Sequence, residues 1–194
     1  MEKENNRLQV LFIGNSHTYC NDMPSMVRRR AADDGFDCRV FMITRGGWYL
    51  AQHVREADVR VDLLCGGSDY VVLQEFAHPF GPAEKYRDAA VALNEMLRRG
   101  GSIPVIYGTW ARKTEPEIQA AMNETHRAVA AEIGALLAPV GENWWAYGKD
   151  HPELELYAAD GAHASPAGSD FAAKIIWETI RDDRLRRLSG PDGR

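Results

Sequence analysis

The sequence predicts an α/β fold in which helices cover both faces of a five-stranded parallel sheet. Short apolar runs alternate along the chain with longer segments whose apolar residues have helical spacing. The first run, residues 8–13, is apolar enough to be buried on both faces, which is typical of a strand in a parallel sheet. Because right-handed crossovers place the loops that follow parallel strands at one edge of the sheet, we expect the functional residues to gather at that edge.

The bounds of the expected elements follow from the apolar spacing and from the glycines and prolines at their ends. The expected strands cover residues 8–13, 38–43, 69–73, 103–107 and 135–140. The longer expected helices cover residues 23–34, 49–64, 82–99 and 114–133, and a last helix begins at Ser165 and Pro166. A short helix or turn is expected over 142–147, followed by a loop over 148–159.

The length of 194 residues and the ordinary composition predict one globular domain. Hydrophobic residues make up 45% of the chain and charged residues 26%, which is enough for a sizeable core beneath a charged surface. We expect this domain to span residues 1–194, with its core over about 8–188. Residues 189–194 are rich in glycine and polar side chains, and they are expected to form a frayed tail.

Charge and targeting signals argue against several classes of partner. The formal net charge of −5 is unfavourable for nucleic acid, because phosphate binding requires a basic surface. No apolar run approaches the roughly 20 residues that span a membrane. The polar residues 1–7 lead directly into the first strand without a visible signal peptide. We therefore expect a cytoplasmic protein that binds neither nucleic acid nor a membrane.

The cysteines and most of the histidines have spacings that favour neither a disulfide framework nor a metal site. Cys20, Cys38 and Cys65 are odd in number and far apart, which is typical of reduced, partly buried thiols. Four histidines are scattered over expected helices and loops without a metal-ligand spacing: His53, His78, His126 and His151. We therefore expect no catalytic metal and no cofactor.

Three residues far apart in the sequence have the chemistry of a serine nucleophile and its base. Ser16 follows Gly14 and Asn15 at the end of the first strand. A serine hydroxyl needs a base at neutral pH, and His163, shortly before the last helix, is the best candidate. Asp160 lies three residues before His163, close enough in a tight turn to accept a hydrogen bond from the other imidazole nitrogen.

A nucleophilic serine also needs hydrogen-bond donors for the oxyanion that forms on its substrate. The natural donors are the backbone N–H groups of Ser16 and Gly47 and the side-chain amide of Gln74, which follow the first three strands. Simpler roles stay open: Ser16 could cap a helix, Gly47 could serve only its turn, and Gln74 could bond a neighbouring loop. His17, next to Ser16, is expected to be structural or to form a wall of the pocket.

Taken together, these blocks resemble the GDSL/SGNH hydrolase superfamily. The resemblance rests on Gly14-Asn15-Ser16, a glycine after the second strand, an amide after the third strand, and Asp160-x-x-His163, and it covers about residues 8–180. It implies a three-layer α/β/α, flavodoxin-like fold and ester hydrolysis through an acyl-serine. Ser16 is then the nucleophile, His163 the general base and Asp160 its orienting group, with Gly47, or less favourably Gly46, as an oxyanion donor.

The function predicted from these residues is that of a serine esterase with a small carboxylic ester as substrate. An acylated carbohydrate is one candidate within that class. Two other functions compete with it: a flavodoxin-like module that holds a phosphate or nucleotide at residues 14–18, and a non-catalytic member of the hydrolase fold. The sequence contains neither a Gly-x-Gly-x-x-Gly motif nor a P-loop lysine, which disfavours nucleotide binding.

Overall fold

The computed structural model describes residues 6–189 of the chain. Its strands are β1 (Arg7–Gly14), β2 (Asp37–Thr44), β3 (Tyr70–Leu73), β4 (Ile103–Tyr107) and β5 (Leu136–Ala138). They form one sheet in the order β2-β1-β3-β4-β5, and every neighbouring pair is parallel. From β1, the chain first adds β2 on one side and then adds β3, β4 and β5 on the other side. The position between β1 and β3 is therefore the topological switch point, where sheets of this kind bind ligands. The predicted five-stranded parallel sheet is confirmed.

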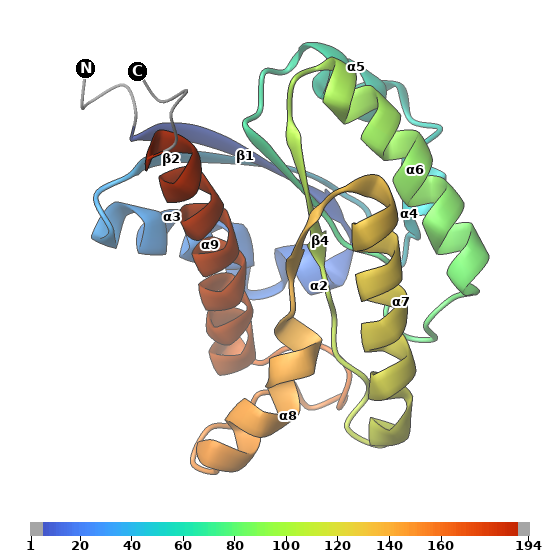
Figure 1. Ribbon diagram of the computed structural model, residues 1–194. Helices are drawn as coiled ribbons and strands as arrows, with labels where there is room; N and C mark the ends of the chain where they lie inside the picture. The colour runs from blue at the N-terminus through green and yellow to red at the C-terminus, as the bar shows by residue number, and fades with distance from the viewer. Residues whose placement is uncertain (1–5, 190–194) are drawn as a thin grey trace.

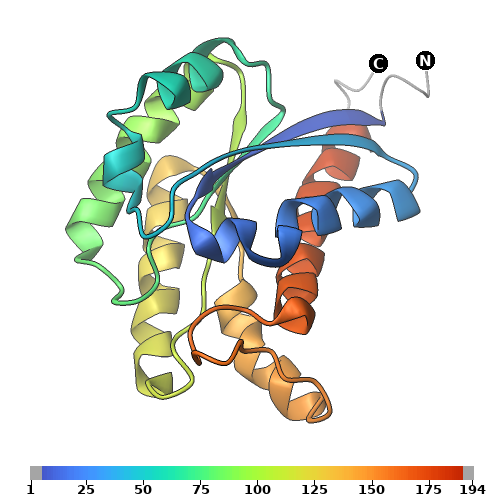
Figure 2. The same ribbon diagram turned by 180° about the vertical axis from the view of Figure 1, so that it is seen from behind.

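Helices cover both faces of this sheet, as Figures 1 and 2 show from opposite sides. One face carries α3 (Met23–Asp33), α8 (Val140–Asp150) and α9 (Pro166–Ser189). The other face carries α4 (Leu50–His53), α5 (Ala57–Cys65), α6 (Ala83–Arg99) and α7 (Gln119–Ile133). Three further helical elements are short: α2 (Ser16–Tyr19) and η1 (Cys20–Asp22) connect β1 to α3, and η2 (Pro116–Ile118) directly precedes α7. The structure is therefore the three-layer α/β/α sandwich expected from the resemblance.

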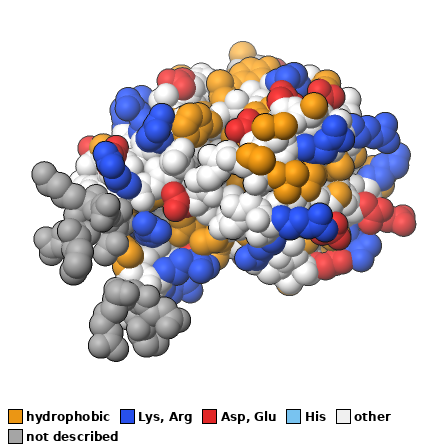
Figure 3. All heavy atoms as spheres, turned by 90° about the horizontal axis from the view of Figure 1, so that it is seen from above, with side chains coloured by type: hydrophobic (Ala, Val, Ile, Leu, Met, Phe, Trp, Pro, Cys, Tyr) orange, Lys and Arg blue, Asp and Glu red, His pale blue; other side chains and the backbone are white. Residues whose placement is uncertain are grey.

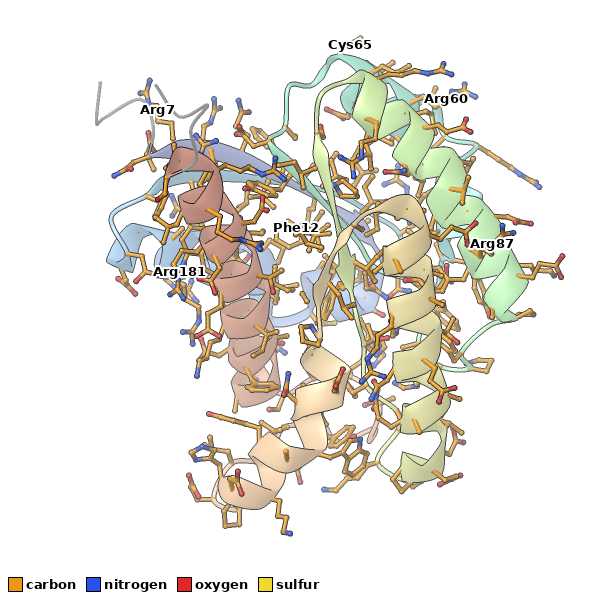
Figure 4. The ribbon with its side chains drawn as sticks, in the orientation of Figure 1. Arg7, Phe12, Arg60, Cys65, Arg87 and Arg181 are labelled. Atoms are coloured by element: carbon orange, nitrogen blue, oxygen red, sulfur yellow. The ribbon has the colours of Figure 1, made fainter. Side chains whose placement is uncertain are left out.

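Strand β1 lies inside the molecule because its side chains contribute to both hydrophobic layers. Val10 and Phe12 point toward α3 and α9, whereas Leu11 and Ile13 point toward the α4–α7 layer. Phe12 is fully buried and occupies the centre of Figure 4, where Arg87 and Arg181 project outward from their helices. Burying a side chain of this size stabilises the fold by roughly 1.5–3 kcal/mol. The strand that leads to Ser16 is thus held in the hydrophobic core on both of its faces.

The structure differs from the sequence-based expectation in three places. The helix expected over 49–64 is two helices, α4 and α5, because α4 is bound to the end of β1 while α5 packs with Val59 and Leu63 in the core. Ser16 lies in the short helix α2 rather than in an open loop, and α8 is longer than the segment 142–147. Of the tail expected over 189–194, only Ser189 is described, as the last residue of α9; the rest lies outside the described residues.

The two edges of the sheet have different chemistry. Figure 3 views the edge at which the strands begin, where acidic and basic side chains are interspersed with hydrophobic ones and no histidine of the described residues is visible. The polar residues Asn15 and Gln74, by contrast, directly follow the carboxyl ends of β1 and β3. Among residues 6–189, no helix combines the length and the apolar character needed to cross a membrane.

Candidate active site

Ser16 is held at the end of β1 by the way helix α2 begins. Asn15 is the N-cap of α2, and its side-chain Oδ1 accepts a hydrogen bond from the backbone N–H of His17 at 3.1 Å. Ser16 is therefore the first residue of the helix, at the carboxyl edge of the sheet beside the switch point between β1 and β3. This turn leaves the Ser16 hydroxyl free to face the loop that precedes α9.

The structure brings Ser16, His163 and Asp160 into one chain of hydrogen bonds. Ser16 Oγ lies 2.8 Å from His163 Nε2, although the two residues are 147 positions apart. His163 Nδ1 lies 2.5 Å from Asp160 Oδ2. With the proton on Nδ1, the imidazole donates to Asp160 and leaves Nε2 to accept from the serine hydroxyl. This is the geometry that the sequence predicts for a nucleophile, a base and an orienting carboxylate.

Asp160 is fixed by the backbone of its own turn as well as by His163. Its Oδ1 accepts hydrogen bonds from the backbone N–H groups of Ala162 at 2.9 Å and His163 at 3.0 Å. The side-chain hydrogen bond from His163, followed by the backbone bond from Ala162, holds the pKa of Asp160 well below its usual range. Asp160 is therefore a carboxylate in a fixed orientation at neutral pH.

Two further contacts join the turn at His163 to the rest of the site. Trp110 Nε1 donates to the carbonyl of Ala162 at 2.9 Å. Asn21 Nδ2 donates to the carbonyl of Ala164 at 2.9 Å, so the residues just after α2 are bound directly to the turn. Asn21 was not singled out from the sequence. Its left-handed conformation, with φ of 56°, is one that asparagine tolerates, so the polar residues between the first strand and helix could have indicated a turn.

Asn15 joins the ends of three neighbouring strands. It is fully buried, its backbone N–H donates to Gln74 Oε1 at 2.8 Å, and its Nδ2 donates to the carbonyl of Trp48 at 2.9 Å. A second contact between the loops runs from the backbone N–H of Arg45 to the carbonyl of Gly14 at 3.1 Å. The loop that follows β2, with Gly47 in it, is therefore fixed beside the start of α2.

The backbone N–H groups of Ser16 and Gly47, which the sequence predicts as oxyanion donors, are not engaged by the protein itself. Within residues 6–189, neither group donates to a protein acceptor. Gly47 has a positive φ of 74°, a conformation that glycine adopts without strain, and it is exposed. A ligand that reached Ser16 could therefore meet unpaired N–H donors on its own loop and on the neighbouring one.

The side chain of Gln74 does not have the environment expected of an oxyanion donor. It is fully buried, and its Oε1 accepts hydrogen bonds from the backbone N–H of Asn15 at 2.8 Å and from Thr18 Oγ1 at 2.9 Å. Its Nε2 donates to the carbonyl of Glu75. A Cβ on Gly14 would lie only 2.5 Å from Gln74 Oε1, so this approach requires glycine there. The Gln74 amide is thus bonded to its neighbours beneath α2, which matches the simpler role left open for it, a bond to a neighbouring loop; its role as an oxyanion donor stays a prediction.

His17 lies behind the candidate base. Its ring centroid is 4.8 Å from that of His163, 5.0 Å from that of His78 and 5.3 Å from that of Trp110. Burial, and then the neighbouring His78, lower the pKa of His17 to about 3, so this ring is neutral near pH 7. The position agrees with the expectation that His17 is structural or forms a wall of the site.

The acidic, histidine and cysteine side chains of the described residues include no group of three or more arranged to hold a metal ion. The arrangement at Ser16 has the groups that covalent catalysis by a serine hydroxyl requires: a hydroxyl, a hydrogen-bonded imidazole, an oriented carboxylate and N–H donors without a protein acceptor.

Comparisons with known proteins identify one group of similar structures. No protein-family model and no curated protein matches this chain. Among solved structures, it is similar to a protein from Slackia heliotrinireducens assigned to the SGNH hydrolases, with 34% identity, a TM-score of 0.79, and coverage of 90% of this chain and 100% of that one.

Two esterase structures share the fold at lower identity. An acetyl xylan esterase, AlAXEase, is 18% identical with a TM-score of 0.70, over 89% of this chain and 100% of its own. A carbohydrate esterase of family 3 from Talaromyces cellulolyticus is 12% identical with a TM-score of 0.68, over 92% and 98% of the two chains. The fold, the order of the sequence blocks and the identity of 34% to the Slackia protein lead to one conclusion: this chain belongs to the SGNH hydrolase family.

Proposed function

We propose that this hydrolase cleaves small carboxylic esters through an acyl-serine intermediate on Ser16. The observation that carries the proposal is the continuous hydrogen-bonded path from Ser16 Oγ to His163 Nε2, at 2.8 Å, and from His163 Nδ1 to Asp160, at 2.5 Å. A phosphate-binding or purely structural serine has no need of a base held in this way. The path therefore favours catalysis over the two competing functions.

In the first half of the reaction, the ester is split and the acyl group is transferred to Ser16. Ser16 Oγ attacks the carbonyl carbon while His163 Nε2 takes the hydroxyl proton. Asp160 stabilises the imidazolium that forms, and the N–H groups of Ser16 and Gly47 donate to the oxyanion. When the tetrahedral intermediate collapses, His163 returns the proton to the departing alcohol oxygen and the acyl-serine remains.

In the second half, water replaces the alcohol. His163 takes a proton from the water molecule as its oxygen attacks the acyl carbonyl, and the same two N–H groups donate hydrogen bonds to the new oxyanion. Collapse of this intermediate breaks the bond to Ser16 Oγ, which recovers its proton from His163. The products are the free acid and the unmodified serine.

An acetylated carbohydrate is a substrate candidate within this class. The support is the similarity of fold to an acetyl xylan esterase and to a carbohydrate esterase of family 3. A carbohydrate ester and a simple aryl ester share the same reacting group, so an activated acetate is a suitable first substrate.

The proposal is tested by comparing hydrolysis of p-nitrophenyl acetate by the wild-type protein and by Ser16→Ala. We expect kcat to fall by about 10⁴-fold or more, because the alanine variant has no nucleophile. Ser25→Ala, which removes a serine from α3, is the matched control and should retain wild-type activity. Equal rates for Ser16→Ala and the wild type would contradict the proposal.

A further inference from the structure

A cavity of about 460 Å³ lies between α4 and the first turn of α6, two helices that pack side by side on one face of the sheet (Figure 1). This volume is in the range of small-molecule binding sites. The residues that line the cavity are aromatic, small or polar: Tyr49, Ala51, Gln52, Glu75, Gly81, Pro82, Lys85 and Tyr86. Two of them continue loops of the candidate active site, since Tyr49 follows the Gly47 loop and Glu75 follows Gln74.

Glu75 gives this cavity a buried carboxyl group that the catalytic mechanism does not use. Only 2% of the residue is exposed. Its Oε1 accepts from the backbone N–H of Phe76 at 2.8 Å and its Oε2 from that of Leu50 at 3.2 Å. A carboxylate has about four acceptor positions, so roughly two remain for a ligand. The ion pairs found among residues 6–189 do not include Glu75.

The protein leaves the charge of Glu75 poorly compensated. Burial raises the pKa of this carboxyl to about 7, against the lowering effect of the backbone bonds from Phe76 and Leu50. A buried charge is costly unless hydrogen-bond donors or an opposite charge compensate it. Hydroxyl groups of a ligand would supply such donors at the position where the protein supplies only two.

Two tyrosines, Tyr49 and Tyr86, line the same cavity as this carboxyl group. The ring of Tyr49 packs against that of Phe76, with centroids 4.6 Å apart. Gly81 leaves room for Tyr49, since a Cβ there would lie 3.1 Å from Tyr49 Cε1. Tyr86 is fixed from behind by a hydrogen bond of 3.2 Å between its hydroxyl and His126 Nδ1. Such rings present rigid apolar faces that suit the C–H faces of a sugar ring.

The charges around the cavity favour a neutral ligand. Glu75 at the inner wall disfavours an anion, while the exposed Lys85 in the first turn of α6 disfavours a cation. Gln52 and Lys85 add exposed hydrogen-bond donors to the lining. A polyhydroxylated neutral group satisfies all three polar side chains and the aromatic walls together.

We propose that this cavity binds a monosaccharide unit, the alcohol portion of the ester, with Glu75 accepting hydrogen bonds from its hydroxyl groups. That the sugar is the alcohol portion of a substrate rests on the proposed esterase function. Binding of a free sugar in the cavity does not depend on that function. The test therefore measures binding without catalysis, by isothermal titration calorimetry with the Ser16→Ala protein in a buffer well above about pH 7, so that Glu75 is ionised.

The probes are methyl β-xyloside, methyl β-glucoside and methyl N-acetyl-β-glucosaminide at millimolar concentrations. We expect at least one to bind, and Glu75→Gln to weaken that binding by about 10- to 100-fold, as for loss of hydrogen bonds to a charged acceptor. Ala51→Phe, which fills the cavity without altering Glu75, should abolish binding. Glu84→Gln, one residue before Lys85 and outside the cavity lining, is the matched control and should bind as the parent protein does.

Absence of binding by all three probes, or binding that Glu75→Gln and Ala51→Phe leave unchanged, would overturn the cavity assignment. Thermal unfolding and circular dichroism of each variant show whether a loss of binding reflects loss of the fold. If Ser16 did not support ester hydrolysis, the proposed function would be wrong. The sugar titrations would still show whether the cavity binds a sugar. The two proposals can thus fail independently.

Discussion

The segments that carry His163 and Gln74 lie at the same edge of the sheet, yet they present their side chains in opposite ways. His163 and Asp160 have side chains that are 34% and 50% exposed, and they bond to each other and to Ser16. Gln74 and Glu75 are buried, and they bond mainly to backbone groups of the adjoining loops. In the proposed mechanism the first segment supplies reactive groups, whereas the second bonds the loops around them.

The largest expected effect is on the exposed segment. His163→Ala should lower kcat for p-nitrophenyl acetate by about 10⁴-fold or more, because Ser16 loses the group that takes its proton. His151→Ala, at the end of α8, is the matched control and should retain activity. If the kcat of His163→Ala lay within a few-fold of the wild-type value, the segment with His163 would not differ in catalytic importance from the segment with Gln74.

Asn15→Asp should have an intermediate effect, because it alters the support of the site and leaves Ser16 and His163 in place. The change replaces the Nδ2 donor by a carboxylate oxygen against the carbonyl of Trp48, 2.9 Å away. The loop with Gly47 should then move, and we expect kcat to fall by about 10- to 100-fold with little change in KM, since the transition-state oxyanion loses a donor. Asn143→Asp, which breaks a similar amide-to-carbonyl bond on α8, is the control. An unchanged kcat would show that Asn15 does not position the Gly47 loop.

Gln74→Ala should act on stability more than on chemistry. It leaves the buried N–H of Asn15 and the hydroxyl of Thr18 without their shared acceptor, which should lower the free energy of unfolding by about 2–4 kcal/mol. Urea unfolding measures this loss, with Gln9→Ala in β1 as the control. A stable variant whose kcat falls by about 10²-fold would instead restore Gln74 as an oxyanion donor.

The buried histidines behind the site should give a pH dependence of stability, with no expected effect on kcat near neutral pH. Burial lowers the pKa of His17 to about 3 and that of His78 to about 4, from 6.5 in the unfolded chain. Between about pH 6.5 and these values, the unfolded chain takes up protons that the folded chain excludes, so stability should fall as the pH falls. Urea midpoints recorded across this range measure the slope. His17→Phe should flatten it, and an equal slope in this variant would contradict the assignment of His17 as a buried neutral ring.

Much of this arrangement could be predicted because the signals are local. Asp160 and His163 lie three positions apart, so one turn fixes their contact, and Ser16 directly follows a strand with an unmistakable apolar pattern. The alternation of strands and helices then places Ser16 and His163 at the same edge of the sheet. The contact between Ser16 and His163 could be predicted although they are 147 positions apart, because the topology of a parallel sheet brings their loops to the same edge.

The direction of the Gln74 side chain could not be predicted in this way. It depends on Asn15 and Thr18, which are 59 and 56 residues away, and on the absence of a Cβ at Gly14. The break between α4 and α5 has a similar origin, since His53 Nε2 contacts the carbonyl of Gly14 at 3.0 Å and fixes α4 to β1. Both features are set by tertiary hydrogen bonds that leave no periodic pattern in the sequence.

The most direct test of the central claim, that Ser16 is a nucleophile activated by His163, is reaction with a fluorophosphonate probe followed by mass spectrometry. We expect the wild-type protein to gain a single adduct that peptide mapping places on Ser16, and His163→Ala to react far more slowly. A wild-type protein that stays unlabelled, or an adduct on another residue with Ser16 unmodified, would contradict the account.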